Sequence, residues 1–168
     1  MEIREARPEE LDALGQLLVA VYAGIEGFPG PKEQPEYYAL LANVGRLQRA
    51  DTLLLVAIGD DGALLGGVVY FSEMTHYGAS EVAMQQRETS AFRLLAVDPA
   101  ARGFGVAKAL VGRCLALARA RGHRQVVIHT TAAQSVAWAM YERLGFVHAP
   151  ELDFTQQGFP IVGFRLAL

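Results

Sequence analysis

The stretch from residue 92 to residue 111 reads FRLLAVDPAARGFGVAKALV. It begins with an apolar run, residues 92–97, that predicts a buried strand, and Asp98-Pro99 ends this strand. From Gly105 to Arg121 the apolar residues recur at steps of three and four, which predicts a helix that ends at Gly122. Residues 125–129 then indicate another short strand. A strand-loop-helix-strand unit of this kind is typical of α/β proteins.

The rest of the chain predicts further strands and helices on both sides of this unit. Strands are expected near residues 2–6, 52–58, 63–71, 146–154 and 160–167, and helices near residues 8–23, 37–47 and 134–144. The polar stretch 72–88 has no clear assignment. The length of 168 residues and the absence of a linker-like segment favour a single mixed α/β domain over residues 1–168.

The composition excludes several classes of function. A net charge of −3 and a pI near 5.8 argue against a nucleic-acid partner. The first ten residues, MEIREARPEE, are charged, and no segment holds the roughly 20 apolar residues of a membrane span. We therefore expect a cytoplasmic protein with no membrane partner. The lone Cys114 cannot form an internal disulfide, and the four histidines lack metal-ligand spacing, so no metal is expected.

The loop between the strand and the helix is suited to binding phosphate. Helix N-termini leave backbone N–H groups unbonded and carry partial positive charge, and Gly103 and Gly105 let a ligand approach the backbone closely. A dinucleotide fingerprint would need a third glycine where Lys108 stands, and a Walker loop would need Gly-Lys-Ser/Thr. The loop alone is equally compatible with an ordinary glycine-rich turn.

Two motifs make the resemblance to a known family specific. Leu95-Ala96-Val97-Asp98-Pro99, followed by Arg102-x-x-Gly105-x-Ala107, resembles the (Gln/Arg)-x-x-Gly-x-(Gly/Ala) signature for acetyl-CoA in the GNAT superfamily of N-acyltransferases. Ala137-x-x-x-Tyr141-x-x-x-Gly145-Phe146 is similar to the later helix and strand of that family. The resemblance implies a GNAT-like α/β fold, with a central, mostly antiparallel twisted sheet of about seven strands flanked by about four helices.

The resemblance also implies how acetyl-CoA would be held. The backbone of the strand end would pair with the pantetheine arm, and the amides of residues 103–107 would hold the pyrophosphate. The expected cofactor-binding residues are Leu95, Ala96, Val97, Arg102, Gly103, Phe104, Gly105, Val106, Ala107, Lys108, Gln134 and Tyr141. Gln134 stands where many relatives have Asn.

Acetyl transfer to an amine needs a stabilised oxyanion, a proton for the departing thiolate and a neutral amine. The resemblance implies that an amide at or beside Val97 polarises the thioester carbonyl, and that Tyr141 is the general acid. A carboxylate base on the preceding strand would fall at position 91, which is Ala. Glu88 is the candidate base, with Glu81 and His76 as alternatives.

The expected function is therefore transfer of an acetyl group from acetyl-CoA to a primary amine of a small molecule or peptide, by direct attack in a ternary complex. The alternative is a non-catalytic acyl-CoA sensor of the same fold, which the alanine at position 91 favours. A nucleotide-binding protein without thioester chemistry is a third reading. In the resembling family, segments equivalent to residues 23–50 and 72–90 select the acceptor, and a homodimer is left open.

Overall fold

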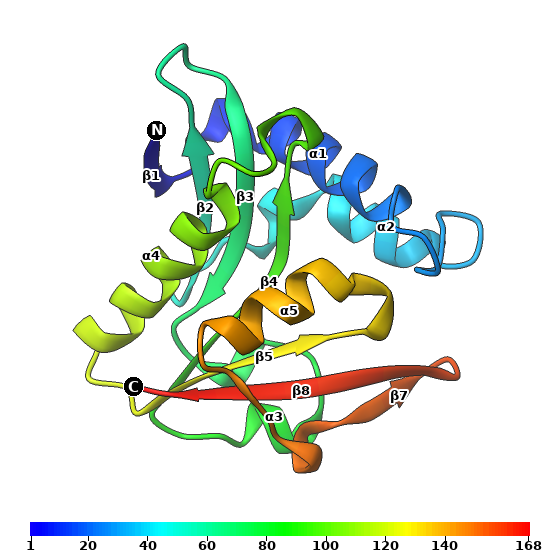
Figure 1. The fold of residues 1–168 in the computed structure, drawn as a ribbon, viewed down its shortest axis with the longest axis vertical. Coiled ribbons are helices and arrows are strands. Elements are labelled where there is room, and N and C mark those ends of the chain that lie inside the picture. The colour runs from blue at the N-terminus through cyan, green and yellow to red at the C-terminus, as the bar shows by residue number, and fades with distance from the viewer. The chain divides into compact units, whose positions relative to one another are not determined.

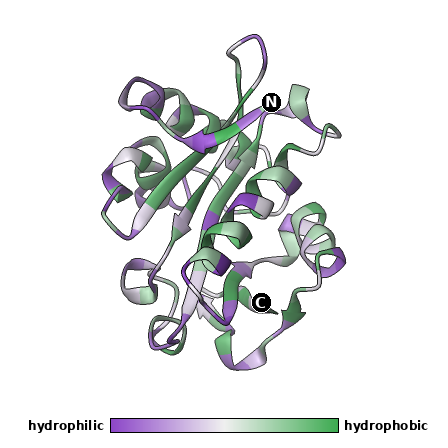
Figure 2. Cartoon of the chain, turned by 90° about the vertical axis from the view of Figure 1, so that its left-hand side faces the viewer, coloured by the Kyte–Doolittle hydropathy of each residue, from purple (hydrophilic) through white to green (hydrophobic).

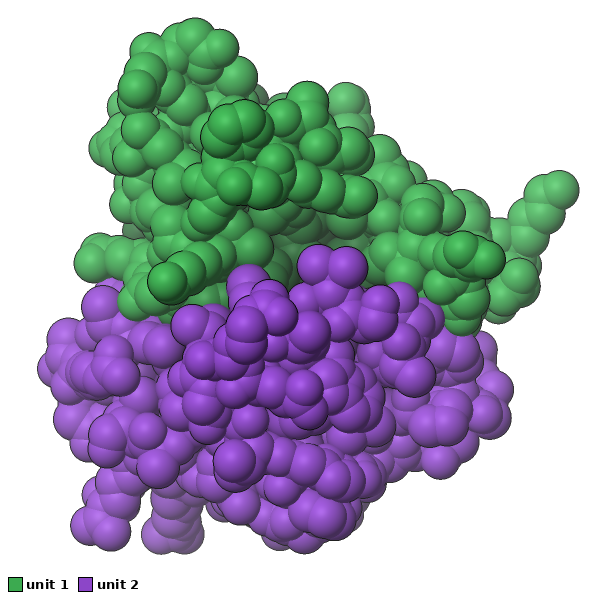
Figure 3. All heavy atoms as spheres, viewed as in Figure 1, with its two compact units in different colours: residues 1–70, 94–113 green, residues 71–93, 114–168 purple.

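The computed structural model describes residues 1–168, which pack as two compact units (Figures 1 and 3). The first unit contains Met1–Tyr70 and Leu94–Arg113, and the second contains Phe71–Arg93 and Cys114–Leu168. Each unit is thus made of two chain segments. Apolar residues follow the strands in both units, whereas the turns are mainly hydrophilic (Figure 2). None of the helices is both long and apolar enough to cross a membrane.

The first unit combines two helices with the first strands of the chain. Its helices are α1 (Leu11–Ala23) and α2 (Pro35–Ala42), and 3-10 turns occupy Pro8–Glu10 (η1) and Val44–Leu47 (η2). Strand β1 (Glu2–Glu5) pairs antiparallel with β2 (Thr52–Ile58), and β3 (Leu64–Phe71) follows in the strand order. The unit also includes the end of β4 (Thr89–Val97) and the start of α4 (Val106–Ala120).

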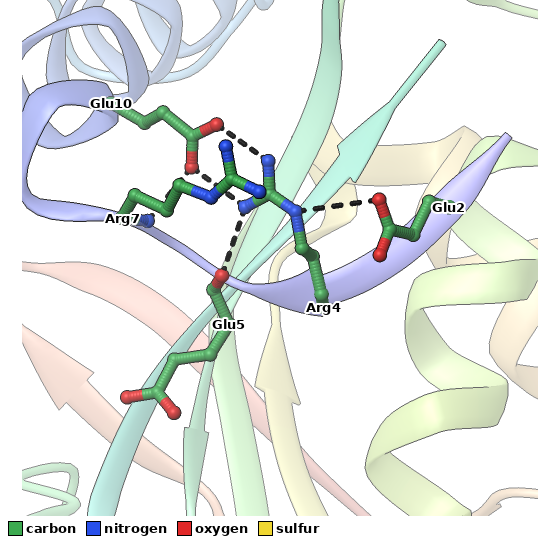
Figure 4. A network of polar contacts seen from close by, with 5 residues as sticks. All are labelled: Glu2, Arg4, Glu5, Arg7 and Glu10. Carbon is green, nitrogen blue, oxygen red and sulfur yellow. Dashed lines mark hydrogen bonds and ion pairs between the residues drawn. The ribbon is translucent and has the colours of Figure 1, made fainter. Parts of the chain in front are cut away.

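A charged network fixes the N-terminal segment of this unit (Figure 4). The two terminal nitrogens of Arg4 donate to the carboxylate of Glu10 at 2.8 and 2.7 Å, and the backbone N–H of Arg7 donates to the same group at 2.7 Å. The hydrogen bonds from Arg4 lower the pKa of Glu10 to about 2, against the opposing effect of burial. The network therefore joins β1 to the turn that precedes α1.

Aromatic rings hold the loop between α1 and α2. Tyr22 contacts Phe28 and Tyr37 with ring centroids 5.4 and 6.0 Å apart. The Tyr38 hydroxyl donates to the carbonyl of Pro29 at 2.9 Å, and Tyr38 is buried. The early aromatic residues Tyr37 and Tyr38 thus help to form the packed interior of this unit.

The second unit contains the start of β4 and all later strands. Strand β5 (Gln125–Thr130) pairs antiparallel with β8 (Phe159–Ala167), which also pairs with β6 (Val147–His148) and β7 (Phe154–Gln156). The helices are α3 (Glu81–Met84), the later part of α4, and α5 (Ser135–Arg143), with 3-10 turns η3 (Met74–His76), η5 (Ala132–Gln134) and η6 (Pro150–Leu152). Helix α5 packs on β8, because Trp138 contacts Phe164 with centroids 5.0 Å apart.

The predicted mixed α/β class is confirmed, with eight strands, five α-helices and mostly antiparallel pairing. Three predicted elements were wrong in extent. The strand expected over residues 92–97 begins earlier, at Thr89. The strand expected over residues 146–154 is interrupted by η6, where Pro150 starts a 3-10 turn. The helix expected over residues 37–47 starts at Pro35 and breaks at Asn43. The expectation of one domain over residues 1–168 stays a prediction.

Candidate functional site

The loop between β4 and α4 lies in the first unit and is held by local hydrogen bonds. The carboxylate of Asp98 accepts from the backbone N–H of Ala100 at 2.8 Å and caps a 3-10 turn, η4 (Pro99–Ala101). The backbone N–H of Asp98 donates to the carbonyl of Leu65 at 2.9 Å, which ties the strand end to β3. Proline at the first position of η4 suits such a turn because it needs no backbone donor there.

The two glycines of the loop give the backbone an open, left-handed course. Gly103 and Gly105 have φ values of 84° and 78°, and a Cβ at either position would meet nothing within 4 Å. Helix α4 starts with the N–H of Ala109 donating to the carbonyl of Gly105 at 2.9 Å. The turn and cap hydrogen bonds leave the amides of residues 103–108 without a backbone acceptor. These amides can therefore satisfy an anionic ligand.

Packing fixes the position of this helix start. Val106 and Leu110 are buried, and Gly66 on β3 lets them approach the sheet, since a Cβ there would lie 2.7 Å from the carbonyl oxygen of Ala96 and 3.1 Å from Val106. Exposed side chains surround the unbonded amides. Arg102 and Lys108 are exposed cations, and Phe104 is 79% exposed. The expected cofactor loop is thus an open surface with two exposed cations, and it precedes a helix start that packs on the sheet.

Strand β4 changes its character before it reaches the loop. Its parallel pairing with β5 runs from Thr89↔Gln125 to Ala91↔Val127, so Phe92 and Arg93 lie beyond the last pair in the second unit. Leu94 then adopts a left-handed φ of 57° although it is 3% exposed. A left-handed residue inside a strand is a bulge geometry, which interrupts regular pairing. The resemblance implies a polarising amide at or beside Val97, and the apolar run of residues 92–97 gave no sign of a left-handed residue at Leu94.

Tyr141 lies in the second unit, on the buried face of α5. It is 6% exposed, and its ring contacts Phe92 and Phe146 with centroids 5.9 and 5.8 Å apart. Burial raises the pKa of its phenol well above the ordinary value of 10.0, and the neighbouring Tyr77 and Cys114 raise it further. Tyr141 is therefore a neutral hydrogen-bond donor at neutral pH.

The side chain of Gln134 takes part in the turn before α5. Its carbonyl oxygen accepts from the backbone N–H of Thr131 and from the Thr130 hydroxyl, each at 3.2 Å. This arrangement orders the entry to the helix. A contact between Gln134 and a cofactor stays a prediction that would have to use the remaining part of the amide.

Glu88 lies immediately before β4, at the end of the strand opposite to Val97. Its carboxylate forms an ion pair with Arg124 at 2.8 Å, and it lines an open pocket of about 450 Å³ formed by residues 73–75 and 84–88. Ala91 is fully buried and offers no carboxylate. Glu88 is therefore paired with Arg124 and lies just before the start of β4, whereas the loop follows the end of this strand.

A polar cluster that the sequence analysis did not anticipate lies in the second unit. The Tyr77 hydroxyl and His129 Nδ1 are 2.8 Å apart, His129 Nε2 is 2.9 Å from the carbonyl oxygen of Leu152, and Arg93 donates to the carbonyl of Tyr77 at 3.0 Å. The members come from separate segments of the chain, 52 residues apart for the tyrosine and histidine. Nothing in the spacing of the histidines indicated this pairing.

Comparison with known proteins places the whole region in one family. Residues 18–146 match the model of the acetyltransferase (GNAT) family. A mycothiol acetyltransferase from Beutenbergia cavernae is 30% identical over 132 residues, which cover 75% of this chain and 40% of that protein. The chain spans less than half the length of the curated relatives that it matches.

Solved structures share the fold over nearly the whole chain. A GNAT-family acetyltransferase from Staphylococcus aureus Mu50 has a TM-score of 0.74 at 14% identity and covers 99% of this chain and 98% of its own. A protein from Salmonella typhimurium, solved with its cofactor acetyl-CoA, has a TM-score of 0.68 at 17% identity and covers 100% of this chain and 94% of its own.

Proposed function

Because the chain belongs to the acetyltransferase (GNAT) family, we propose that it is an N-acetyltransferase that moves an acetyl group from acetyl-CoA to a primary amine of a small molecule or peptide. The observation that carries the proposal is the start of α4, where the amides of residues 103–108 have no backbone acceptor and the two glycines leave open space. A diphosphate matches such a helix start in both charge and hydrogen bonding.

The residues present fit the donor substrate. The amides of residues 103–107 hold the pyrophosphate, the exposed Arg102 and Lys108 supply positive charge, and the backbone of residues 95–97 pairs with the pantetheine arm. Acetyl-CoA supplies the activated acetyl group as a thioester. Each of these roles, and a contact between Gln134 and the cofactor, is proposed because the residue matches a position of the family signature.

Tyr141 is the proposed general acid. Its phenol stays protonated at neutral pH because burial raises its pKa, so it can donate a proton to the departing sulfur. The rings of Phe92 and Phe146 keep it in place. Glu88 stays the base named from the sequence alone.

The test first measures binding of the donor substrate and then the effect of replacing the proposed acid, Tyr141. The melting temperature of the protein should rise when CoA or acetyl-CoA is added, because a ligand that binds only the folded state stabilises it. An amine panel with thiol detection then identifies the acceptor. Replacing Tyr141 by Phe should lower kcat about 10²–10⁴-fold with little loss of affinity for acetyl-CoA, since the ring is kept and only the hydroxyl is lost.

Tyr38→Phe is the matched control, because it removes another buried phenol whose partner is the carbonyl of Pro29. It should keep the kcat of the wild type, and any change should appear in the KM for the acceptor, because Tyr38 lies in the segment 23–50. Unchanged turnover in Tyr141→Phe would remove the acid assignment. CoA binding with no thiol release from any amine would instead support the sensor alternative. A cytoplasmic location, a homodimer and a single domain over residues 1–168 stay predictions.

A further inference from the structure

The hydrogen bonds of His129 determine which of its nitrogens is basic. The carbonyl of Leu152 can only accept, so His129 Nε2, 2.9 Å away, carries the hydrogen. Nδ1 is then the unprotonated nitrogen and accepts from the Tyr77 hydroxyl at 2.8 Å. The imidazole is therefore held in one tautomer, with its basic nitrogen turned toward a phenol.

The Tyr77–His129 pair lies on the face of the sheet opposite to Tyr141. On β5, Ile128 is paired with Phe164, whose ring contacts α5, so the next residue, His129, points to the other face. On β4, Phe92 contacts Tyr141, and the next residue, Arg93, reaches the Tyr77 carbonyl.

Both faces are occupied at the point where β4 and β5 cease to pair. The last paired residues are Ala91 and Val127, and His129 follows two residues later on β5. A thioester bound at the end of this pairing would have a proton donor on one face of the sheet and a proton acceptor on the other, as thiolate departure and amine attack require.

The surroundings keep the pair uncharged at neutral pH. Burial lowers the pKa of His129, and the guanidinium of Arg93 lowers it further, while the bond to Leu152 and the carboxylate of Asp153 oppose this. Burial raises the pKa of Tyr77. The imidazole is therefore free to take up a proton, whereas Glu88 is engaged by Arg124 and position 91 offers no carboxylate.

We propose that Tyr77 and His129 together form the proton acceptor for the amine, a role that rests on the acetyl transfer proposed above. The Tyr77 oxygen takes a proton from the ammonium of the acceptor, directly or through one water, as its own proton passes to His129 Nδ1. The neutral amine forms the C–N bond to the acetyl carbon and the C–S bond breaks. Tyr141 protonates the sulfur and recovers the second nitrogen proton, and His129 returns its proton to solvent.

The experiment measures kcat/KM for the acceptor found in the amine panel, from pH 6 to pH 9. The wild type should level off above the pKa of His129, because it can use the ammonium form. His129→Gln can still donate to Leu152 but cannot take up a proton, so it depends on free amine. Its kcat/KM should be about 100-fold lower than that of the wild type at pH 7. The difference should shrink about tenfold per pH unit, because the unprotonated fraction of an amine with a pKa of about 10.4 grows by that factor.

Tyr77→Phe keeps the ring that packs on Phe71, with centroids 5.6 Å apart, and removes only the hydroxyl. It should show the same deficit that shrinks with pH, and it carries the test if His129→Gln does not fold. His148→Gln is the control, because His148 is an exposed histidine of the same unit bonded to Asp153; its ratio to wild type should stay constant with pH.

A constant deficit at all pH values in both variants, or full activity in both, overturns the relay and assigns the cluster a structural role. Absence of turnover by the wild-type protein with every amine overturns the proposed function, and the relay with it. The two failures are therefore distinguishable.

Discussion

Leu94 is a buried leucine in a backbone conformation that suits glycine. Its φ of 57° costs a residue with a Cβ about 1–2 kcal/mol. The side chain is 3% exposed, and its burial offsets that cost. The residue therefore stabilises the bulge of β4 through packing while its backbone remains strained, and the two contributions can be separated by substitution.

Leu94→Gly should be more stable than Leu94→Ala by about 1 kcal/mol, because both lose the side chain but only alanine keeps the strain. At an ordinary strand position, the alanine variant would be more stable than the glycine variant. Ala96→Gly, at a buried position of the same strand, should lower stability by about 0.5–1 kcal/mol and is the control. Urea denaturation of the four proteins measures this, and equal midpoints for the two Leu94 variants would contradict the strain.

At the scale of elements, the support of the cofactor loop depends on a close approach between β3, β4 and α4. Gly66 provides the space for it, because its missing Cβ would meet the backbone of Ala96 and the side chains of Val106 and Leu110 at 2.7, 3.1 and 3.4 Å. A backbone carbonyl cannot turn aside as a flexible side chain can. The start of α4 is therefore positioned by one small residue on a neighbouring strand.

Gly66→Ala should lower stability by about 1–3 kcal/mol through overpacking and should weaken CoA binding, because the amides at the helix start shift. Calorimetry and titration with CoA measure the two effects. Gly112→Ala, on the exposed side of α4 with nothing within 4 Å, should raise stability slightly and leave CoA binding unchanged. Normal CoA affinity in Gly66→Ala would show that the loop does not depend on this contact.

The elements with a clear apolar pattern were predictable, whereas the four-residue helix α3 was not. The strand 52–58 was predicted with its observed bounds because TLLLVAI is a continuous apolar run between turn residues. Helix α3 has four residues, which is too few to show a period, and its start is set by Ser80 accepting from the N–H of Ala83 at 3.2 Å. At the candidate site, the loop was visible as a motif. The Tyr77–His129 pair was not, because only tertiary folding brings residues 52 positions apart together.

At the scale of the whole molecule, each unit contains a carboxylate whose charge is favoured by folding. Glu10 has a pKa of about 2 in the first unit, below its ordinary 4.5. In the second unit, burial raises the pKa of Asp153, but hydrogen bonds from the Gly163 amide and from His148 outweigh it and lower the pKa. A carboxyl with a lowered pKa in the folded state stabilises the protein above its unfolded pKa and loses that contribution as pH falls.

The melting temperature should therefore fall as pH is lowered from about 5 toward 2. Glu10→Gln should be less stable than wild type at pH 6 and should approach it at low pH, because the wild-type carboxylate becomes protonated there. Glu9→Gln, at an exposed neighbouring position, should follow the wild-type curve. Thermal melts at several pH values measure this, and parallel curves for Glu10→Gln and wild type would rule out the contribution of the charged network.

The chain passes from one unit to the other in the middle of β4, between Arg93 and Leu94, and again inside α4, between Arg113 and Cys114. No single cut in the gene can therefore release either half as an intact piece. A split-protein reporter or a truncated expression fragment ending at these borders would sever a strand or a helix. Insertions intended to leave both units folded belong instead in the exposed turn near Asp61-Gly62.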